Sequence, residues 1–518
     1  MWRWQVLCCC SSGCGSRADR RRQGPRATGE NGLQQAGTTL ANGFDFDVMV
    51  IGAGYGGFDA ARHAAEHGLG TAIVESHDLG GTCVNRGCVP SKALLAASGK
   101  VRELSNQAAL AALGVHTGPV QFERQAIADH AARLVETIRG NIGRSLERAG
   151  ARILAGRGRL DGPNRVVVRA ASGIERTYSS RHVILATGSD PLVPPGIEID
   201  GHTVFTSDDA LRLEWLPDWI AIIGSGYIGL EFADVYTALG CEVTMIEALD
   251  RVMPSFDRDI TRVAARQLVD SRGIETRTGV LATRIEPGSP VKIELSDCET
   301  RRPVDTLEVD AALVATGRLP VSRDLNLASI GLELGRSGFI PVDDQMHVLG
   351  ADAAIPWLWA VGDVTGKMML AHTAAAQGTV AVENILGHQR SVDYRSIPAA
   401  TFTHPEISSV GLSHEQAEAL AAREGFALGA VRSHFKANSK ALAENESDGL
   451  MKLLFRKDNG EVLGAHIHGL HAADLIQEVA NAVARRQSVK DLAYEVHTHP
   501  TLSEVVEAAY RQAAAAVA

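Results

Sequence analysis

The chain has 518 residues and a mass of 55.0 kDa, which is more than one hydrophobic core usually serves, so about two to four domains are expected. Its 45% hydrophobic and 22% charged residues are typical of soluble globular proteins, and no apolar run approaches the roughly 20 residues of a membrane helix. The formal charge of -10 argues against a general nucleic-acid binder. Neither a membrane nor a nucleic acid is expected as a partner.

The first 43 residues are predicted to be an organelle transit peptide. The leader is rich in arginine, lacks lysine and has no acidic residue before Asp19. A disordered tail that is never cleaved is the alternative. The leader also holds Cys8, Cys9, Cys10 and Cys14, which leaves only four cysteines for the folded body. That number does not suit a secreted disulfide framework.

A first dinucleotide-binding pattern begins near Phe44. The segment DFDVMVIGAGYGGFDAARHAAEHGLGTAIVES predicts a buried strand, a glycine turn, a helix and a second strand that ends at Glu75. Gly52, Gly54 and Gly57 would form the turn and let a pyrophosphate approach the helix N-terminus. Glu75, 18 residues beyond the third glycine, would hold ribose hydroxyls.

Two cysteines follow directly in the stretch GGTCVNRGCVPSK. Cys83 and Cys88 are predicted to lie at or just before a helix start, where the unpaired N-H groups and the helix dipole favour the thiolate. Gly87 would let the backbone bend between them, and Pro90 suits an early helical position. We infer a reversible dithiol and disulfide pair. Buried inert cysteines are one alternative, and a zinc site would need a second Cys or His pair of suitable spacing.

The dinucleotide pattern recurs in WIAIIGSGYIGLEFADVYTALGCEVTMIEA. Gly224, Gly226 and Gly229 repeat the glycine spacing, and Glu247 again lies 18 residues beyond the third glycine. A carboxylate accepts a hydrogen bond from a free ribose 2'-hydroxyl and repels a 2'-phosphate. The second site is therefore expected to prefer NAD over NADP.

Two further segments suggest that the dinucleotide domains are interleaved. Residues 182–191 and 311–320 both place a strand before Ala-Thr-Gly. In WLWAVGDVTGKMMLAHTAAAQG we predict a strand ending at Asp363 and a helix beginning near Ala371, a second contact for the first dinucleotide. Asp363 as a simple helix cap or turn former is the alternative.

The C-terminal stretch EVHTHPTLSEVVEAAY contains a candidate base. His499 lies five residues before Glu504, and a carboxylate that holds a histidine is a common way to make a base near neutral pH. His497 is close by. A core histidine or a weak metal pair are the alternatives from the local sequence.

Together these motifs resemble the flavin-dependent pyridine nucleotide-disulfide oxidoreductases, from Phe44 to about Tyr510. The stretches that carry the resemblance are GAGYGG, GGTCVNRGCVPSK, the two ATG sequences, GSGYIGLE, AVGDVTG, MLAHTAAAQG and HTHPTLSE. The amino-acid sequence around these motifs is most similar to that of plastid and cyanobacterial members. The expected fold is α/β, with two Rossmann-like dinucleotide domains and a C-terminal α+β dimerisation domain. The expected boundaries are 44–195 with 330–396 for FAD, 196–329 for NAD and 397–518 for dimerisation.

The resemblance implies which residues contact the two cofactors, FAD and NAD. For FAD it implies Gly52, Gly54, Gly57, Glu75, Thr82, Lys92, Gly156, Thr187, Asp363, Ala371 and His372. For NAD it implies Gly224, Gly226, Gly229, Glu231, Glu247 and Gly317. An ion pair between Lys92 and Glu231 near the flavin is implied as well, and Tyr227 would cover the ring or simply pack there. No metal is expected.

The resemblance also implies a reaction, the oxidation of protein-bound dihydrolipoamide with NAD⁺. His499, oriented by Glu504, would take a proton from the substrate, whose thiolate attacks Cys83, while Cys88 passes charge to FAD. His499 and Glu504 would come from the partner subunit of a homodimer. The implied protein partners are the lipoyl domains of an E2 acyltransferase or the glycine-cleavage H-protein. The expected compartment is the plastid stroma, with the mitochondrial matrix as the alternative.

Three rival functions remain. Glutathione reductase is the nearest enzymatic alternative, although Glu247 disfavours an NADPH enzyme. Mercuric reductase is disfavoured because no cysteine follows Cys298. The third is a FAD-binding assembly subunit without turnover, which would need neither the cysteines nor His499.

Overall fold

The computed structural model describes residues 43–212 and 214–517. The predicted transit peptide, apart from Gly43, lies outside the described residues. Within the described part of the chain, no helix combines the length and the apolar character needed to cross a membrane.

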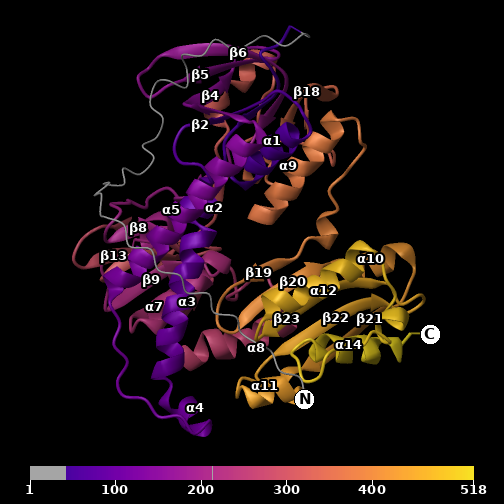
Figure 1. The fold of residues 1–518 in the computed structure, drawn as a ribbon. Helices are drawn as coiled ribbons and strands as arrows, with labels where there is room; N and C mark the ends of the chain where they lie inside the picture. Colours follow the sequence, from indigo (N-terminus) through magenta and orange to yellow (C-terminus); the bar gives the residue numbers. More distant parts are fainter. Residues whose placement is uncertain (1–42, 213, 518) are drawn as a thin grey trace, which may run out of the picture. The chain divides into compact units, whose positions relative to one another are not determined.

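The first sheet joins the start of the chain to a segment far along it (Figure 1). Its order is β17-β18-β6-β1-β2-β3, and the hairpin of β4 and β5 extends β6. β1 pairs in parallel with β2 and β6, and its apolar run is buried because both faces of such a sheet are covered. The strands are β1 (Phe46–Ile51), β2 (Thr71–Glu75), β3 (Arg152–Ala155), β4 (Arg157–Leu160), β5 (Arg165–Arg169), β6 (Glu175–Leu185), β17 (His347–Leu349) and β18 (Ala354–Ala360).

The second sheet is wholly parallel, in the order β11-β10-β9-β15-β8. A three-stranded antiparallel sheet, β12-β13-β14, shares a hydrophobic core with it. The strands are β8 (Val204–Thr206), β9 (Trp219–Ile223), β10 (Glu242–Glu247), β11 (Glu275–Thr278), β12 (Val280–Glu286), β13 (Val291–Asp297), β14 (Pro303–Val309) and β15 (Ala311–Val314). The strands predicted before the two Ala-Thr-Gly sequences are confirmed as β6 and β15. Just beyond them, β7 (Ser189–Pro191) pairs with β16 (Arg318–Pro320).

The C-terminal sheet is antiparallel, in the order β19-β20-β23-β22-β21. Its strands are β19 (Ala399–Thr401), β20 (Glu406–Gly411), β21 (Leu428–His434), β22 (Leu450–Arg456) and β23 (Val462–Gly469). Helices α12 (Ala472–Ala484) and α14 (Glu504–Ala514) contribute to its core.

The remaining helices connect or cover these sheets. They are α1 (Tyr55–Glu66), α2 (Gly81–Arg86), α3 (Cys88–Ser105), α4 (Gln107–Ala112), α5 (Arg124–Ala149), α6 (Ser207–Ala210), α7 (Tyr227–Ala238), α8 (Arg258–Leu268), α9 (Ala371–Ile385), α10 (His414–Glu424), α11 (Ser439–Ala443) and α13 (Val489–Leu492). Short 3-10 turns occur at Asp270–Arg272, Arg323–Leu325, Leu327–Ile330, Asp363–Thr365, Tyr394–Ser396 and Phe435–Ala437.

One predicted boundary was wrong. The strand expected to end at Asp363 ends at Ala360, because Gly362 has a φ of 78° and turns the chain into the 3-10 segment that Asp363 begins. The helix predicted near Ala371 begins there.

Candidate active site

The cysteine segment rests against the first glycine loop. Gly80 and Gly81 have φ values of 99° and 57°, a conformation that side chains other than glycine rarely adopt. The amide of Gly80 donates to the carbonyl of Ala53 at 2.8 Å, and a Cβ on Gly81 would lie 2.6 Å from the Cα of Gly54. The glycine pair therefore brings the thiols beside the predicted pyrophosphate site.

Gly87 separates two helices that each carry one cysteine. Cys83 and Thr82 lie in α2, whereas Cys88 is the first residue of α3. A Cβ on Gly87 would lie only 2.9 Å from the carbonyl oxygen of Thr82, so glycine allows this close turn. The prediction of a helix start is confirmed for Cys88. Cys83 lies in the first turn of a separate short helix, α2, which was not predicted.

The two thiols are electrostatically unequal. Both are free in this structure. The Cys83 thiol donates a hydrogen bond to the Cys88 sulfur, and this bond is the largest effect that lowers the pKa of Cys88. Burial opposes it and the Lys92 charge adds to it, and together these effects lower the pKa of Cys88 to about 7. The same hydrogen bond, together with burial, raises the pKa of Cys83. Cys88 is thus the sulfur that carries the thiolate near neutral pH.

Lys92 and Glu231 form an ion pair next to the thiols. The Lys92 Nζ lies 2.9 Å from both carboxylate oxygens of Glu231, which is buried in α7. Phe402 holds the pair in place: its amide donates to Glu231 Oε1 at 3.0 Å, and its ring centroid lies 4.6 Å from Nζ. No local pattern in the sequence pointed to Phe402.

A second ionic contact fixes α3 against α7. Arg102 Nη2 lies 2.5 Å from Asp234 Oδ1, and Arg272 Nη1 lies 2.7 Å from the same oxygen. Asp234 is buried and receives both guanidinium groups. The helix that carries Cys88 is therefore anchored at both ends of its contact with α7.

Alkylation should reveal this electrostatic setting. In reduced protein, the rate at Cys88 is expected to rise with pH to a plateau above an apparent pKa of about 7, because only the thiolate reacts. Lys92→Met should move the midpoint to higher pH and Glu231→Gln to lower pH, since the two charges act in opposite directions. Rates come from mass spectrometry of iodoacetamide-labelled peptides. Lys100→Met, an exposed position on α3, is the matched control, and an unmoved midpoint in Lys92→Met would contradict the assignment.

The predicted FAD residues of the first glycine motif meet at the ends of β1 and β2. Gly52 has a φ of 105°, and a Cβ there would lie 2.4 Å from the carbonyl of Ala186. Gly54 is the N-cap of α1, and the first turn of that helix has no side-chain cap. Glu75 Oε2 accepts from the amide of Ala53 at 2.7 Å. Uncapped amides and a carboxylate at a strand end are groups that suit phosphates and ribose.

Gly156 and Thr187 lie beside this motif. The amide of Gly156 donates to the carbonyl of Glu75 at 2.8 Å, and a Cβ on Gly156 would lie 2.6 Å from the carbonyl of Arg169. Thr187 follows β6 and donates its hydroxyl to the carbonyl of Val321.

The predicted FAD residues that follow β18 are Asp363, Ala371 and His372. Asp363 Oδ2 accepts a hydrogen bond of 2.5 Å from Ser189 Oγ, which in turn accepts from Arg318 Nε at 2.7 Å. Ala371 begins α9, whose N-terminus also lacks a side-chain cap. His372 Nε2 donates to the carbonyl of Pro398 at 2.8 Å. No sequence motif indicated Ser189 and Arg318, which join the two segments after the Ala-Thr-Gly strands.

The close packing of the first glycine motif predicts a strong effect of one methyl group. A Cβ on Gly57 would lie 1.9 Å from the carbonyl oxygen of Gly52, so Gly57→Ala is expected to open the loop and leave most of the protein without FAD. Gly99→Ala in α3 is the control, because nothing lies within 4 Å of that position. The ratio of FAD to protein after gel filtration measures the effect. Full FAD content in Gly57→Ala would contradict the prediction that FAD binding needs this tight turn.

Four of the six predicted NAD residues, Gly224, Gly226, Glu247 and Gly317, line a cavity of about 370 Å³, whereas Gly229 and Glu231 do not. Gly224 and Gly229 repeat the tight geometry of the first motif, since a Cβ on Gly229 would lie 2.0 Å from the carbonyl of Gly224. Gly226 is the N-cap residue of α7, and no side chain caps that helix start; Gly317 has a φ of 135°. Lining residues include Gly224, Gly226, Tyr227, Glu247, Gly317 and Arg318.

Glu247 repeats the hydrogen bonds of Glu75. Its side chain is buried, and Oε2 accepts from the amide of Ser225 at 3.0 Å and from the Ser225 hydroxyl at 2.6 Å. The carboxylate thus stands at the wall of the cavity, where it would face the ribose of a dinucleotide. Tyr227 also lines this cavity and is exposed, an arrangement that suits either predicted role.

His499 and Glu504 form the predicted pair. His499 Nδ1 donates to Glu504 Oε1 at 2.8 Å, and this bond is the largest cause that lowers the pKa of Glu504. The His499 side chain is 70% exposed. His497 differs: it is 8% exposed, and its Nε2 lies 3.0 Å from Glu478. Among the described residues, no hydrogen bond or ion pair joins His499 to Cys83 or Cys88 of the same chain.

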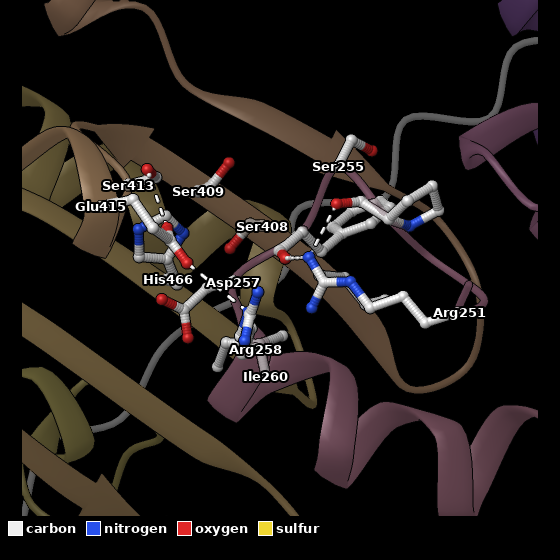
Figure 2. A pocket seen from close by; sticks show the side chains of 13 residues that line it. Arg251, Ser255, Asp257, Arg258, Ile260, Ser408, Ser409, Ser413, Glu415 and His466 are labelled. Atoms are coloured by element: carbon white, nitrogen blue, oxygen red, sulfur yellow. Dashed lines mark hydrogen bonds and ion pairs between the residues drawn. The ribbon is translucent and has the colours of Figure 1, made fainter. Parts of the chain in front are cut away.

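A further cavity of about 260 Å³ lies between the start of α8 and the C-terminal sheet (Figure 2). Several of its charges are paired: Arg258 Nε lies 3.7 Å from Glu415, and Lys452 Nζ lies 2.7 Å from Asp257, whereas Arg251 donates to the carbonyl of Pro254 at 2.8 Å. Burial lowers the pKa of His466, which favours the neutral ring. The cavity contains none of the predicted site residues and is not part of the candidate site.

Comparison with known proteins defines the class. The family model described as pyridine nucleotide-disulphide oxidoreductase matches residues 46–378, and its dimerisation-domain model matches residues 397–510. The chain therefore belongs to the pyridine nucleotide-disulphide oxidoreductase family. The predicted fold class is confirmed, and the family's cofactors, FAD and NAD(H), are the predicted ones.

Individual relatives show which members of this family the chain is similar to. The chain is 58% identical to a dihydrolipoyl dehydrogenase of Synechocystis over 474 residues, which cover 92% of this chain and 100% of that protein. It is 53% identical to the chloroplastic dihydrolipoyl dehydrogenase 2 of Arabidopsis thaliana, covering 91% and 82%. The crystal structure of LpdA from Mycobacterium tuberculosis matches with a TM-score of 0.81 and 29% identity, covering 90% and 99%. The predicted resemblance to plastid and cyanobacterial enzymes of the dihydrolipoyl dehydrogenase type is confirmed.

Proposed function

We propose that this chain oxidises protein-bound dihydrolipoamide to lipoamide and transfers the two electrons to NAD⁺. The observation that carries the proposal is the thiol pair, which lies on the first glycine loop beside the Lys92–Glu231 ion pair, with the pKa of Cys88 lowered to about 7. The named dihydrolipoyl dehydrogenases among its relatives support the substrate. Lipoyl domains of an E2 acyltransferase or the lipoylated H-protein would deliver that substrate.

The base is His499 of the partner subunit. The match to a dimerisation domain supports a homodimer, and within one chain His499 is bonded to Glu504 and not to the cysteines. Because Nδ1 donates to Glu504, Nε2 is the nitrogen that would accept the substrate proton.

The thiol exchange follows from the unequal cysteines. The enzyme begins with a Cys83–Cys88 disulfide, and the first substrate thiolate attacks Cys83 Sγ, which breaks that bond and releases Cys88 as a thiolate. Lys92 and the N-terminus of α3 stabilise the leaving thiolate. The second substrate sulfur loses its proton and attacks the first, which closes the lipoamide disulfide and returns Cys83 as a thiol. Two electrons now reside on the cysteine pair.

The polar and charged groups of the two glycine motifs suit FAD and NAD. FAD, when bound, supplies the two-electron transfer from the cysteine pair to NAD⁺. The proposed FAD residues are those around Gly52, Glu75, Asp363 and the start of α9. Lys92 would place its charge near the flavin, and Glu247 would hold the NAD ribose and exclude a 2'-phosphate.

Turnover assays distinguish the candidate functions. Purified protein should reduce NAD⁺ with dihydrolipoamide and should show little turnover of NADPH with oxidised glutathione. The reverse result would favour a glutathione reductase. If FAD-loaded protein shows neither activity, an assembly subunit without turnover would be favoured.

We place the enzyme in the plastid stroma. The chloroplastic relative and the arginine-rich leader support this compartment. A fluorescent fusion to residues 1–43 should accumulate in plastids, and accumulation in mitochondria would overturn the placement.

A further inference from the structure

Three side chains with metal-binding atoms gather away from the thiols, where α1 and α9 end. They are His63, His67 and Glu383, and one ligand atom from each lies within 4.8 Å of the others. His63 lies in the last turn of α1, His67 is the C-cap of that helix, and Glu383 lies near the end of α9.

The packing of the two helices brings this cluster together. α1 and α9 lie side by side (Figure 1). Glycine at position 378 allows their close approach, since a Cβ there would lie only 2.4 Å from the carbonyl of Gly56. Further along, His63 Nε2 lies 2.7 Å from Glu383 Oε1. His63 and His67 are four residues apart, so their rings share one helix face, with centroids 4.3 Å apart.

Two hydrogen bonds around the cluster orient His67 and Glu383 for a cation, which would displace the proton that His63 Nε2 donates to Glu383 Oε1. His67 Nδ1 lies 2.8 Å from the carbonyl oxygen of His63, which can only accept, so Nδ1 carries the proton and Nε2 keeps a free lone pair. His388 Nδ1 lies 2.9 Å from Glu383 Oε2, the oxygen that faces away from His63. Such an outer hydrogen bond orients a metal-binding carboxylate.

The local charge also favours a cation. Both helices end here, and helix C-termini carry a partial negative charge. Arg62, the neighbouring cation, is engaged by Asp59 at 2.9 Å and by Glu66 at 3.4 Å. His67 and His388 are exposed, so an ion could enter from solvent.

We propose that His63, His67 and Glu383 bind one divalent transition-metal cation of the Zn²⁺ class, with water completing the coordination and His388 holding the carboxylate. Two imidazoles and a carboxylate are a common zinc ligand set. The 2.7 Å between His63 and Glu383 needs to open only to the ~3.3 Å of two ligands in tetrahedral geometry. No metal was expected from the sequence, and Glu383 is 320 residues from His63 along the chain, so no local spacing indicates this cluster.

The cation would join α1 to α9 at the ends opposite their uncapped N-termini. Those N-termini carry Gly54 and Ala371, both proposed to face FAD. The site is thus a link within the cofactor-binding part of the chain, and it does not depend on which disulfide is the substrate.

Zinc titration of the FAD-loaded full chain tests the proposal, with a chromophoric chelator as competitor. The wild type is expected to bind one Zn²⁺ per chain more than His67→Gln and Glu383→Gln, and His388→Gln should weaken that site about 10–100-fold. His116→Gln, an exposed histidine outside the cluster, is the matched control and should bind as the wild type does. All variants keep every cysteine, so cations bound elsewhere cancel in the comparison.

Unfolding temperature gives a second measurement. Zn²⁺ should raise the unfolding temperature of the wild type and of His116→Gln more than that of His67→Gln, because a cation that binds only the folded state stabilises it. Equal Zn²⁺ stoichiometry and equal thermal shifts in wild type, His67→Gln and Glu383→Gln would overturn the proposal.

Discussion

Serine at position 83 or 88 is expected to lower the rate of dihydrolipoamide oxidation by more than about 10³-fold, the scale on which loss of a nucleophile acts. A hydroxyl cannot form the disulfide that receives the two electrons, so neither single variant can complete the exchange. Steady-state NADH formation with dihydrolipoamide measures the effect.

The same variants should keep their cofactor sites. FAD content and NADH-dependent reduction of an artificial dye are expected to persist, because neither needs the dithiol. Cys298→Ser, another free and partly buried cysteine, is the matched control and should turn over dihydrolipoamide normally. Normal turnover in Cys83→Ser or Cys88→Ser would refute the relay.

His499→Gln is expected to lower kcat by about 10²- to 10⁴-fold, the usual contribution of a general base. Glutamine keeps a polar group of similar size but cannot accept the substrate proton at neutral pH. Stopped-flow reduction of the enzyme by dihydrolipoamide isolates this step. His471→Gln, an exposed histidine of the same C-terminal part, serves as the control.

Mixed dimers reveal which subunit supplies the base. A dimer of Cys83→Ser with His499→Gln has one intact site if the cysteines of one chain work with the histidine of the other. It has none if both act within one chain. Recovery of activity when the two inactive variants are unfolded and refolded together is the expected result. An inactive mixture containing verified heterodimers would place the base within the same chain, and an unchanged rate in His499→Gln would remove it from the mechanism.

The local patterns predicted the parts of the fold that depend on short stretches of sequence. Both glycine motifs, the strands before them and the uncapped helices after them appear where the spacing placed them, since each motif encodes its own turn. The pair of His499 with Glu504 was also predictable, because five residues separate them within one loop and helix start.

Other features depend on segments that meet only in the folded chain. Phe402 reaches Glu231 across 171 residues of sequence, and Glu383 reaches His63 across 320. No local spacing signals such contacts. The Lys92–Glu231 pair was expected only through the family resemblance, and the unequal pKa values of the two thiols arise from a hydrogen bond that forms across the bend at Gly87.

The most direct measurement is a crystal structure of the oxidised, FAD-loaded enzyme. The proposed relay requires a bond of about 2.05 Å between Cys83 and Cys88, with Cys88 against the flavin ring and Cys83 open to the substrate side. Two sulfurs remote from the ring, or bound to a metal, would contradict it.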